Sequence, residues 1–297
     1  MNLRPLGSTG LRVSHVGVGC WQLGGDGWGS VSSLDVQAAV LRALELGVHV
    51  LDTAPIYGFG QSEELLGRML SARRGETIEA TVVISKAGLV WDDQRRVRHD
   101  NRPESLRAQL EGTLRRLRRE RLDVLLLHWP DPSVPLEESV AALDALRGEG
   151  KIRAWGLSNF PAGEVLRLAR TDMVLEYPSN VLKTYAKEAR VAALAGEELL
   201  ASGAAGACGF IAYDVLARGL LGGRYSASTR FGKRDLRARD DRFSPESFSQ
   251  NLESARRMPS AVAAIRGVLE NPSVSCALVG IKTLAQAEEM GTVPFPM

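Results

Sequence analysis

The feature that most constrains the fold is an alternation of short apolar runs with amphipathic helical patterns along the whole chain. Several runs are apolar without a break, which indicates strands that are buried on both faces. Eight such strands joined by helices predict a closed (β/α)8 TIM barrel of the α/β class. The strands are predicted at residues 16–19, 49–53, 82–86, 124–128, 152–158, 173–177, 210–215 and 277–281.

Local signals place the connecting elements. Residues 3–13 predict a short N-terminal β-hairpin, and Ser62 is a plausible N-cap of the second helix, with Gly47 just after the first. The segment 222–250 has no regular pattern, and a loop of this length in a compact domain is usually functional or mobile. Helices are predicted at 33–46, 63–73, 103–119, 136–147, 162–170, 187–202, 252–269 and 284–290.

Composition limits the class of protein. The length of 297 residues, 44% of them hydrophobic, fits one barrel domain over residues 1–297. A net charge of +2 gives no sign of a nucleic-acid or membrane partner, and we interpret the arginine-rich run at 114–122 as the solvated face of a helix. Three cysteines without CxxC spacing and an N-terminus without an apolar export signal favour a cytoplasmic protein. No motif predicts a metal site.

Polar side chains stand where predicted strands end. Asp52 closes one strand and Tyr57 follows in a Pro/Gly loop, while Lys86 and His128 close the next two. The carboxyl ends of barrel strands meet on one face, which carries the active site in this architecture. Taken singly, each residue has an ordinary structural interpretation, as a cap, a rim aromatic, a surface lysine or a core histidine. Four of them in this order indicate catalysis.

Asp52, Tyr57, Lys86 and His128 resemble the catalytic tetrad of the aldo-keto reductases. Segments 7–25, 150–160, 212–223 and 278–289 also resemble this family in the same order, so the resemblance covers almost the whole chain. It implies an NADP(H)-dependent oxidoreductase that interconverts a small-molecule carbonyl (aldehyde, ketone or keto-sugar) and an alcohol. Tyr57 would be the general acid/base, with its pKa lowered by Lys86. Asp52 would hold Lys86, and His128 would orient the carbonyl.

The resemblance also implies a cofactor site, with NADP(H) favoured over NAD(H). Ser158 and Asn159 would hold the nicotinamide amide and Tyr213 would stack on its ring. No GxGxxG motif opens a helix after a strand, so Rossmann-type binding is not expected. Lys282 would bind the 2′-phosphate, although a solvated lysine explains the residue equally well. The remaining expected cofactor residues are Leu216, Arg218, Gly219 and Leu221 after strand seven, and Thr283 and Gln286 after strand eight; Trp21, Trp28, Trp91 and Trp129 are candidates for the substrate pocket, or for rim packing.

Two positions depart from the family pattern. The alignment places Val174 where the family has a glutamine that contacts the carboxamide, and Met290 where it has an asparagine near the adenine. Valine cannot make the hydrogen bonds of glutamine. Two alternatives therefore stay open. One is an NAD(P)+-dependent sugar or alcohol dehydrogenase on the same fold. The other is a barrel without hydride transfer that serves as a binding or regulatory subunit, or as a non-redox enzyme.

Overall fold

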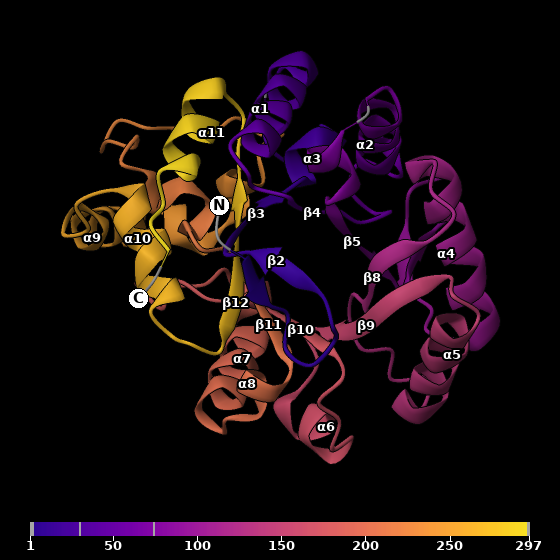
Figure 1. The fold of residues 1–297 in the computed structure, drawn as a ribbon. Helices are drawn as coiled ribbons and strands as arrows, with labels where there is room; N and C mark the ends of the chain where they lie inside the picture. The colour runs from indigo at the N-terminus through magenta and orange to yellow at the C-terminus, as the bar shows by residue number, and fades with distance from the viewer. Residues whose placement is uncertain (1–2, 30, 74, 296–297) are drawn as a thin grey trace.

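A computed structural model describes residues 3–29, 31–73 and 75–295. Eight parallel strands close into a barrel with helices outside it, which confirms the predicted fold class (Figure 1). Each strand pairs with the next along the chain, and the last pairs with the first. The barrel strands are β3 (Val16–Gly19), β4 (Val50–Asp52), β5 (Val82–Ala87), β8 (Leu122–Leu127), β9 (Ile152–Ser158), β10 (Val174–Pro178), β11 (Gly209–Tyr213) and β12 (Val274–Gly280).

The helices form an outer ring, whose apolar faces pack on the barrel in one large core. The first and last of them, α1 and α11, lie side by side and close the ring (Figure 1). The α-helices are α1 (Ser33–Glu45), α2 (Gln61–Ser71), α3 (Glu76–Glu79), α4 (Pro103–Leu117), α5 (Leu136–Gly148), α6 (Ala162–Arg167), α7 (Arg190–Ala201), α8 (Ala204–Ala207), α9 (Pro245–Arg256), α10 (Ala261–Leu269) and α11 (Leu284–Gly291). Short 3-10 helices are η1 (Trp21–Gly24), η2 (Lys187–Ala189), η3 (Ala217–Gly222), η4 (Leu236–Arg239) and η5 (Asp241–Phe243).

A second core fills the inside of the barrel. Alternate residues of the strands, such as Val50 and Ile84, meet there with Leu6, Leu11 and Val13 of the N-terminal hairpin. The hairpin consists of β1 (Leu3–Pro5) and β2 (Arg12–Ser14), as predicted, and it lies across the N-terminal end of the barrel (Figure 1). With this end covered, the C-terminal end is left for a binding site, which is the usual place in this architecture.

Three local expectations need correction. Ser62 does not cap α2, because Gly60 holds the N-cap position with a φ of 99°, and the Ser62 hydroxyl donates to Cys20 O instead. The helix predicted at 252–269 is two helices, α9 and α10. Pro259 lacks an N–H and disfavours helical backbone before it, and Ser260 caps the second helix. A second hairpin, β6 (Leu89–Trp91) with β7 (Val97–His99), follows β5 and was not predicted.

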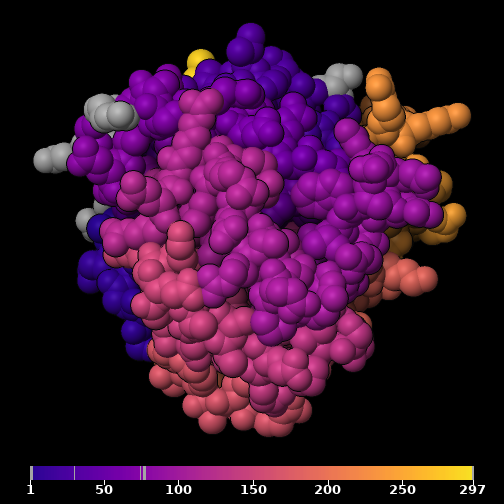
Figure 2. All heavy atoms as spheres, turned by 90° about the vertical axis from the view of Figure 1, so that its right-hand side faces the viewer, coloured from indigo at the N-terminus to yellow at the C-terminus, as the bar shows by residue number. Residues whose placement is uncertain are grey.

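The outer face over α2, α4 and α5 is a continuous surface of side chains (Figure 2). The arginine-rich run ends α4 here, and part of it is engaged in ion pairs rather than only solvated. Arg116 Nε donates to the buried Glu63 at 2.6 Å, and Arg119 pairs with Asp123 at 2.8 Å. Among the described residues, no helix is both long and apolar enough to span a membrane.

Candidate active site

The polar groups of the site follow a simple positional rule. At the ends of five strands, a polar residue stands two positions after an apolar residue of the inner core. Because strand side chains alternate, such a residue points inward, one layer nearer the C-terminal end. The pairs are Val50 and Asp52, Ile84 and Lys86, Leu126 and His128, Val174 and Glu176, and Ile211 and Tyr213. The rule brings Asp52, Lys86 and His128 to one place, and the loop after β4 adds Tyr57, whose ring contacts Lys86 and His128.

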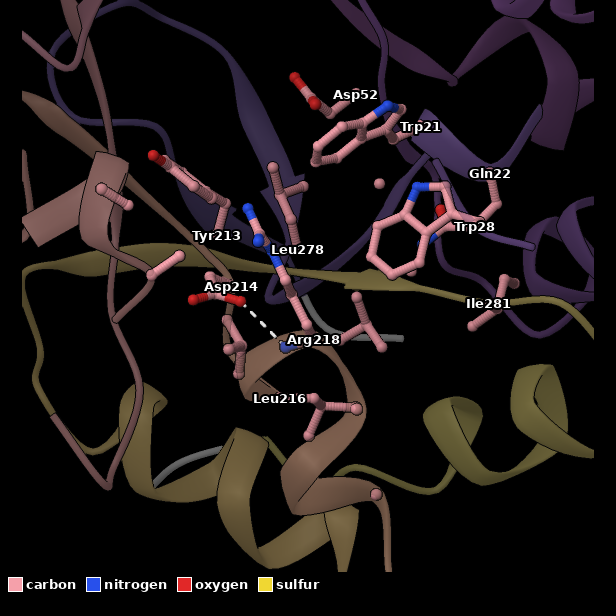
Figure 3. A pocket seen from close by; sticks show the side chains of 18 of the residues that line it. Trp21, Gln22, Trp28, Asp52, Tyr213, Asp214, Leu216, Arg218, Leu278 and Ile281 are labelled. Atoms are coloured by element: carbon pink, nitrogen blue, oxygen red, sulfur yellow. Dashed lines mark hydrogen bonds between the residues drawn. The ribbon is translucent and has the colours of Figure 1, made fainter. Parts of the chain in front are cut away.

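A cavity of about 580 Å³ opens at this end of the barrel. Trp21 and Trp28 stand together on one side of it, and Tyr213 and Arg218 come from the opposite side (Figure 3). The predicted residues that line it are Trp21, Trp28, Asp52, Tyr57, His128, Trp129, Ser158, Asn159, Tyr213, Leu216, Arg218, Gly219, Lys282, Gln286 and Met290.

Lys86 lies at the centre of a buried charge cluster below the cavity. Its Nζ donates to Asp52 Oδ2 at 2.5 Å and to Thr53 O at 3.2 Å, and it is 3.3 Å from Glu176 Oε1. Burial disfavours the ammonium, but Asp52 and Glu176 outweigh it, so the pKa of Lys86 is raised. Burial raises the pKa of Asp52, against the pull of Lys86. Lys86 is therefore a permanent cation beside two carboxyl groups.

Tyr57 is held against this cation by aromatic contacts. Its ring stacks on Trp21 at 5.6 Å between centroids, and Lys86 Nζ is 5.5 Å from the ring centre. The expectation of a lowered phenol pKa is wrong as a net effect. Burial raises the pKa of Tyr57, and Lys86 only opposes this shift. Tyr57 is consequently a fully protonated donor at neutral pH, with a cation ready to stabilise its phenolate.

His128 directly follows β8 and packs edge-on against Tyr57 at 6.1 Å. Its backbone N–H donates to Ala87 O at 2.8 Å, which fixes it to the neighbouring strand. Burial, and then Lys86, lowers the pKa of His128 well below its usual range. The imidazole is therefore neutral, so that it can donate a hydrogen bond from one nitrogen and accept one at the other.

Ser158, Asn159 and Tyr213 form a hydrogen-bonded group at the ends of β9 and β11, on either side of β10. Ser158 Oγ donates to Glu176 O at 3.0 Å, and Tyr213 Oη donates to Asn159 Oδ1 at 2.7 Å. Asn159 Nδ2 donates to His128 O at 3.0 Å, from a backbone with φ of 66°. An asparagine tolerates this left-handed conformation better than most residues. The network orients the three side chains that were predicted to meet the nicotinamide.

Glu176 is the site residue that sequence analysis missed. Val174, assigned to the position of the family glutamine, packs in the inner core and does not line the cavity. Glu176, two residues later, lines it and pairs with Ser158 across the sheet. The residue of this strand that reaches the cavity is therefore Glu176, and Val174 lies one layer below it. The signal that could have found Glu176 is a single charged residue at the end of an apolar strand.

Three other predicted site residues do not line the cavity. Trp91 lies on the β6–β7 hairpin and packs edge-on against Phe59 at 5.4 Å. Leu221 is buried in a satellite core with Phe248. Thr283 caps α11, where its Oγ1 accepts from Gln286 N at 3.3 Å. These three side chains lie outside the cavity lining, and their contact with a cofactor or substrate stays a prediction.

The turn after β11 places Arg218 at the cavity wall. Arg218 has a φ of 54° and its N–H donates to Asp214 Oδ1 at 3.0 Å (Figure 3). Its guanidinium reaches Asp240 at 2.8 Å, and the buried Arg242 joins Asp240 and Asp214. The neighbouring Gly219, with φ of 92°, has a conformation that side chains rarely adopt. This charged network ties loop residues 240–242 to the turn and fixes its backbone.

The far end of the cavity is basic and is crossed by the long loop. Lys282 Nζ donates to Trp28 O at 3.2 Å and lies 5.1 Å from the ring centre of Trp28. Leu236 N donates to Gly27 O at 2.9 Å, so the loop after β11 meets the loop after β3. Burial, followed by the charge of Arg237, lowers the pKa of Lys282 to about 8.

Three buried polar atoms at the cavity have no hydrogen-bond partner among the described residues: Gln22 Oε1, Trp28 Nε1 and Glu176 Oε2. An unpaired buried polar atom is costly, and its usual partner is water or a ligand. The cavity that these atoms face has aromatic and cationic walls and unpaired polar groups, and such residues fit a dinucleotide with a planar amide and phosphates.

A protein-family model described as "Aldo/keto reductase family" matches residues 15–293. The chain belongs to the aldo-keto reductase family. This membership identifies it as an NAD(P)H-dependent oxidoreductase.

Similar proteins agree with this assignment. The reductase is 30% identical to the aldo-keto reductase YhdN of Bacillus subtilis, over 99% of this chain and 88% of YhdN. It is 35% identical to an NADH-specific methylglyoxal reductase of Escherichia coli over 54% of this chain and 53% of that protein. A glycerol dehydrogenase structure from Gluconobacter oxydans superposes with a TM-score of 0.81 at 31% identity, covering 99% of this chain and 90% of that one. A Klebsiella pneumoniae aldo-keto reductase in complex with NADPH has a TM-score of 0.66 at 25% identity, covering 95% and 86%.

Proposed function

We propose that this reductase transfers a hydride between NADP(H) and a small-molecule carbonyl or alcohol, with Tyr57 as the proton donor and acceptor. The observation that carries the proposal is that Tyr57, Asp52 and His128 line one cavity with Ser158 and Asn159, while Lys86 lies directly below and is paired with Asp52. The cofactor supplies the hydride when it is bound. The protein supplies the proton and the orientation of the substrate.

The proton donor works through its surroundings. A carbonyl oxygen within hydrogen-bond reach of Tyr57 and neutral His128 is polarised by both donors. As negative charge develops on that oxygen, the phenol proton moves to it, and Lys86 stabilises the phenolate that remains. Asp52 keeps Lys86 in place at 2.5 Å. The aromatic wall of Trp21, Trp28 and Trp129 favours a substrate with an apolar or ring-shaped body.

The choice of NADP(H) over NAD(H) rests on the basic end of the cavity. Lys282 and Arg224 both line it there, and an additional phosphate would be favoured beside them. The Klebsiella relative was crystallised with NADPH, whereas the Escherichia coli relative is named NADH-specific. A direct comparison of dissociation constants for NADPH and NADH tests this part of the proposal, and tighter binding of NADH would refute it.

The reaction itself is tested with a panel of aldehydes, ketones and keto-sugars. The decrease in NADPH absorbance measures the rate of each reduction. We expect turnover of at least one class, and its loss in Tyr57→Phe. A wild-type protein that binds NADPH and reduces no carbonyl, while oxidising no alcohol in the reverse assay, would favour the non-redox alternative.

A second candidate is oxidation of a polyol with NADP+ or NAD+. It is favoured by the similarity to a glycerol dehydrogenase at 31% identity over almost the whole chain. The same proton relay serves both directions, since the phenolate of Tyr57 can take the proton that the phenol gives. Initial rates with glycerol and oxidised cofactor, compared with rates for the matching carbonyl and reduced cofactor, distinguish the two.

A further inference from the structure

Glu176 is a buried ionisable group in the wall of the proposed cofactor cavity. Its side chain is almost fully buried, lines the cavity next to Ser158, and ends in an oxygen, Oε2, that receives no hydrogen bond from any described residue. Its other oxygen is 3.3 Å from Lys86. A buried acceptor that faces a binding cavity without a partner needs an explanation.

The charge count of the cluster is unbalanced. Lys86 carries one positive charge, and Asp52 and Glu176 are two carboxyl groups around it. The two buried carboxyl groups share one cation, so a cluster without net charge must carry a proton on one of them. The neutral form of the cluster therefore holds one extra proton, and loss of that proton leaves a net negative charge under the cavity.

We propose that Glu176 is a titratable buried charge beside the nicotinamide end of the cofactor cavity, and that its ionisation favours the oxidised cofactor over the reduced one. The inference rests on the proposed cofactor. The oxidised nicotinamide ring is cationic and the reduced ring is neutral, so a nearby carboxylate attracts only the first. Protonated Glu176 has a donor and an acceptor, as an amide has, and serves both forms equally.

The titration falls in an accessible range. Burial, and then the charge of Asp52, raises the pKa of Glu176 to about 8. The other ionisable groups around the cavity floor are shifted away from that value: the pKa values of Tyr57, Tyr213, Lys86 and Cys276 are raised, and that of His128 is lowered well below its usual range. Asp52 shares the proton with Glu176 and titrates as its partner. Lys282 titrates near pH 8 as well, at the phosphate end.

The test is the ratio of the dissociation constants of NADPH and NADP+ between pH 6 and pH 9. This ratio cancels the effect of Lys282, because both cofactors carry the same adenosine phosphates. NADPH binding is followed by its fluorescence, and NADP+ binding by quenching of the cavity tryptophans. In the wild type we expect the preference for NADP+ over NADPH to rise about tenfold as the pH increases from 6 to 9. This is the effect of two unit charges about 10 Å apart at an effective dielectric constant of about 20.

Three variants locate the effect. Glu176→Gln should bind both cofactors with a ratio that does not change with pH. Glu176→Asp should keep a pH-dependent ratio, because it keeps the ionisable group. The control is Glu198→Gln, which removes the same charge from the exposed face of α7, the helix that packs on β10, and should behave as the wild type. A ratio that still changes with pH in Glu176→Gln would overturn the assignment to this residue.

A second measurement needs no variant. Calorimetry in buffers of different ionisation enthalpy should show that the wild type near pH 8 releases protons when it binds NADP+ and releases fewer when it binds NADPH. Equal proton release for both cofactors would overturn the inference while leaving the proposed function intact. If the wild type binds neither cofactor, both the inference and the proposed function are wrong.

Discussion

At the scale of single residues, the site works by placing charges where water cannot screen them. Lys86 is buried between Asp52 and Glu176, and the phenol of Tyr57 lies beside it. Burial alone would make Tyr57 a very weak acid, and the lysine reduces that penalty. The catalytic strength of the phenol therefore depends on one buried cation, which makes the two residues separately testable.

Replacing Tyr57 with phenylalanine should reduce carbonyl reduction by roughly 100-fold to 10,000-fold, the usual contribution of a positioned proton donor. The ring and its stacking on Trp21 remain, so NADPH binding should be almost unchanged. Steady-state rates and NADPH fluorescence titrations measure the two effects. A variant that keeps near wild-type turnover would remove Tyr57 from the mechanism.

Replacing Lys86 with methionine should suppress reduction by about 100-fold or more near neutral pH, because the phenolate loses its stabilising cation. The pKa of Tyr57 rises further in this variant, so the residual rate should depend on pH differently from the wild type. It also leaves Asp52 and Glu176 without a cation, and they should take up protons. An unchanged rate and pH profile would contradict the role of Lys86.

Replacing Lys282 with alanine should weaken NADPH far more than NADH, since a charge-assisted hydrogen bond contributes about 1.5–3 kcal/mol. In the wild type, the preference for NADPH should decline above pH 8, because the pKa of Lys282 is about 8 and the neutral amine attracts phosphate weakly. Fluorescence titrations at pH 7 and pH 9 measure this. Lys151→Ala, an exposed charge removed at the start of β9, is the control. Equal losses for both cofactors would refute the assignment.

At the scale of elements, each strand contributes an inner layer for stability and a polar end for chemistry. The alternation of apolar strands and helices predicted the barrel, and strand ends predicted Asp52, Tyr57, Lys86 and His128. Glu176 was not predicted because two residues of one strand, 174 and 176, face the same interior and only the second lines the cavity. Sequence periodicity gives the face of a strand but not the depth along it, which depends on the register between neighbouring strands.

Loops were harder to predict than strands for a physical reason. Trp91 ends a three-residue strand and Leu221 lies in the 3-10 helix η3, and such short elements give no sequence period that shows where a side chain points. The contacts of Arg218, Asp214 and Arg242 join residues 28 positions apart or fewer through a loop that has no hydrophobic pattern. Only tertiary packing decides such contacts, so sequence patterns indicate a functional loop but not its geometry.

Replacing Val174 with glutamine tests whether the side chain at this position lies in the inner core or reaches the cofactor. We expect a loss of about 1–3 kcal/mol in the free energy of unfolding, because the amide would be buried in the inner core without partners. Cofactor affinity should not improve. Val191→Gln, at a position on α7 that is 73% exposed, should change stability by at most about 0.5 kcal/mol. Urea unfolding measures both. Tighter NADPH binding in Val174→Gln would instead support position 174 as the contact to the nicotinamide carboxamide.

At the scale of the whole molecule, one end of the barrel is covered and the other end is open to the cavity. The hairpin β1–β2 covers the N-terminal end with Leu6, Leu11 and Val13, and the apolar inner core ends one layer below the cavity. The charged cluster of Lys86, Asp52 and Glu176 sits on top of this core, away from water. Burying these groups costs folding free energy that the apolar layers offset. The site should therefore affect the free energy of unfolding of the whole protein.

We expect the free energy of unfolding to depend on pH because of Glu176. Its pKa is about 8 in the folded protein, above the unfolded value, so the folded state binds this proton more tightly. The stabilising effect is fully present below the unfolded pKa and is lost as the pH rises through 8. Between pH 6 and pH 8 the wild type should lose up to about 2 kcal/mol relative to Glu176→Gln, at about 1.4 kcal/mol per pH unit. Denaturant unfolding of both proteins at the two pH values measures the difference, in which the contributions of groups that do not interact with Glu176 cancel. Parallel stability curves for the two proteins would mean that Glu176 does not change its protonation on unfolding in this range.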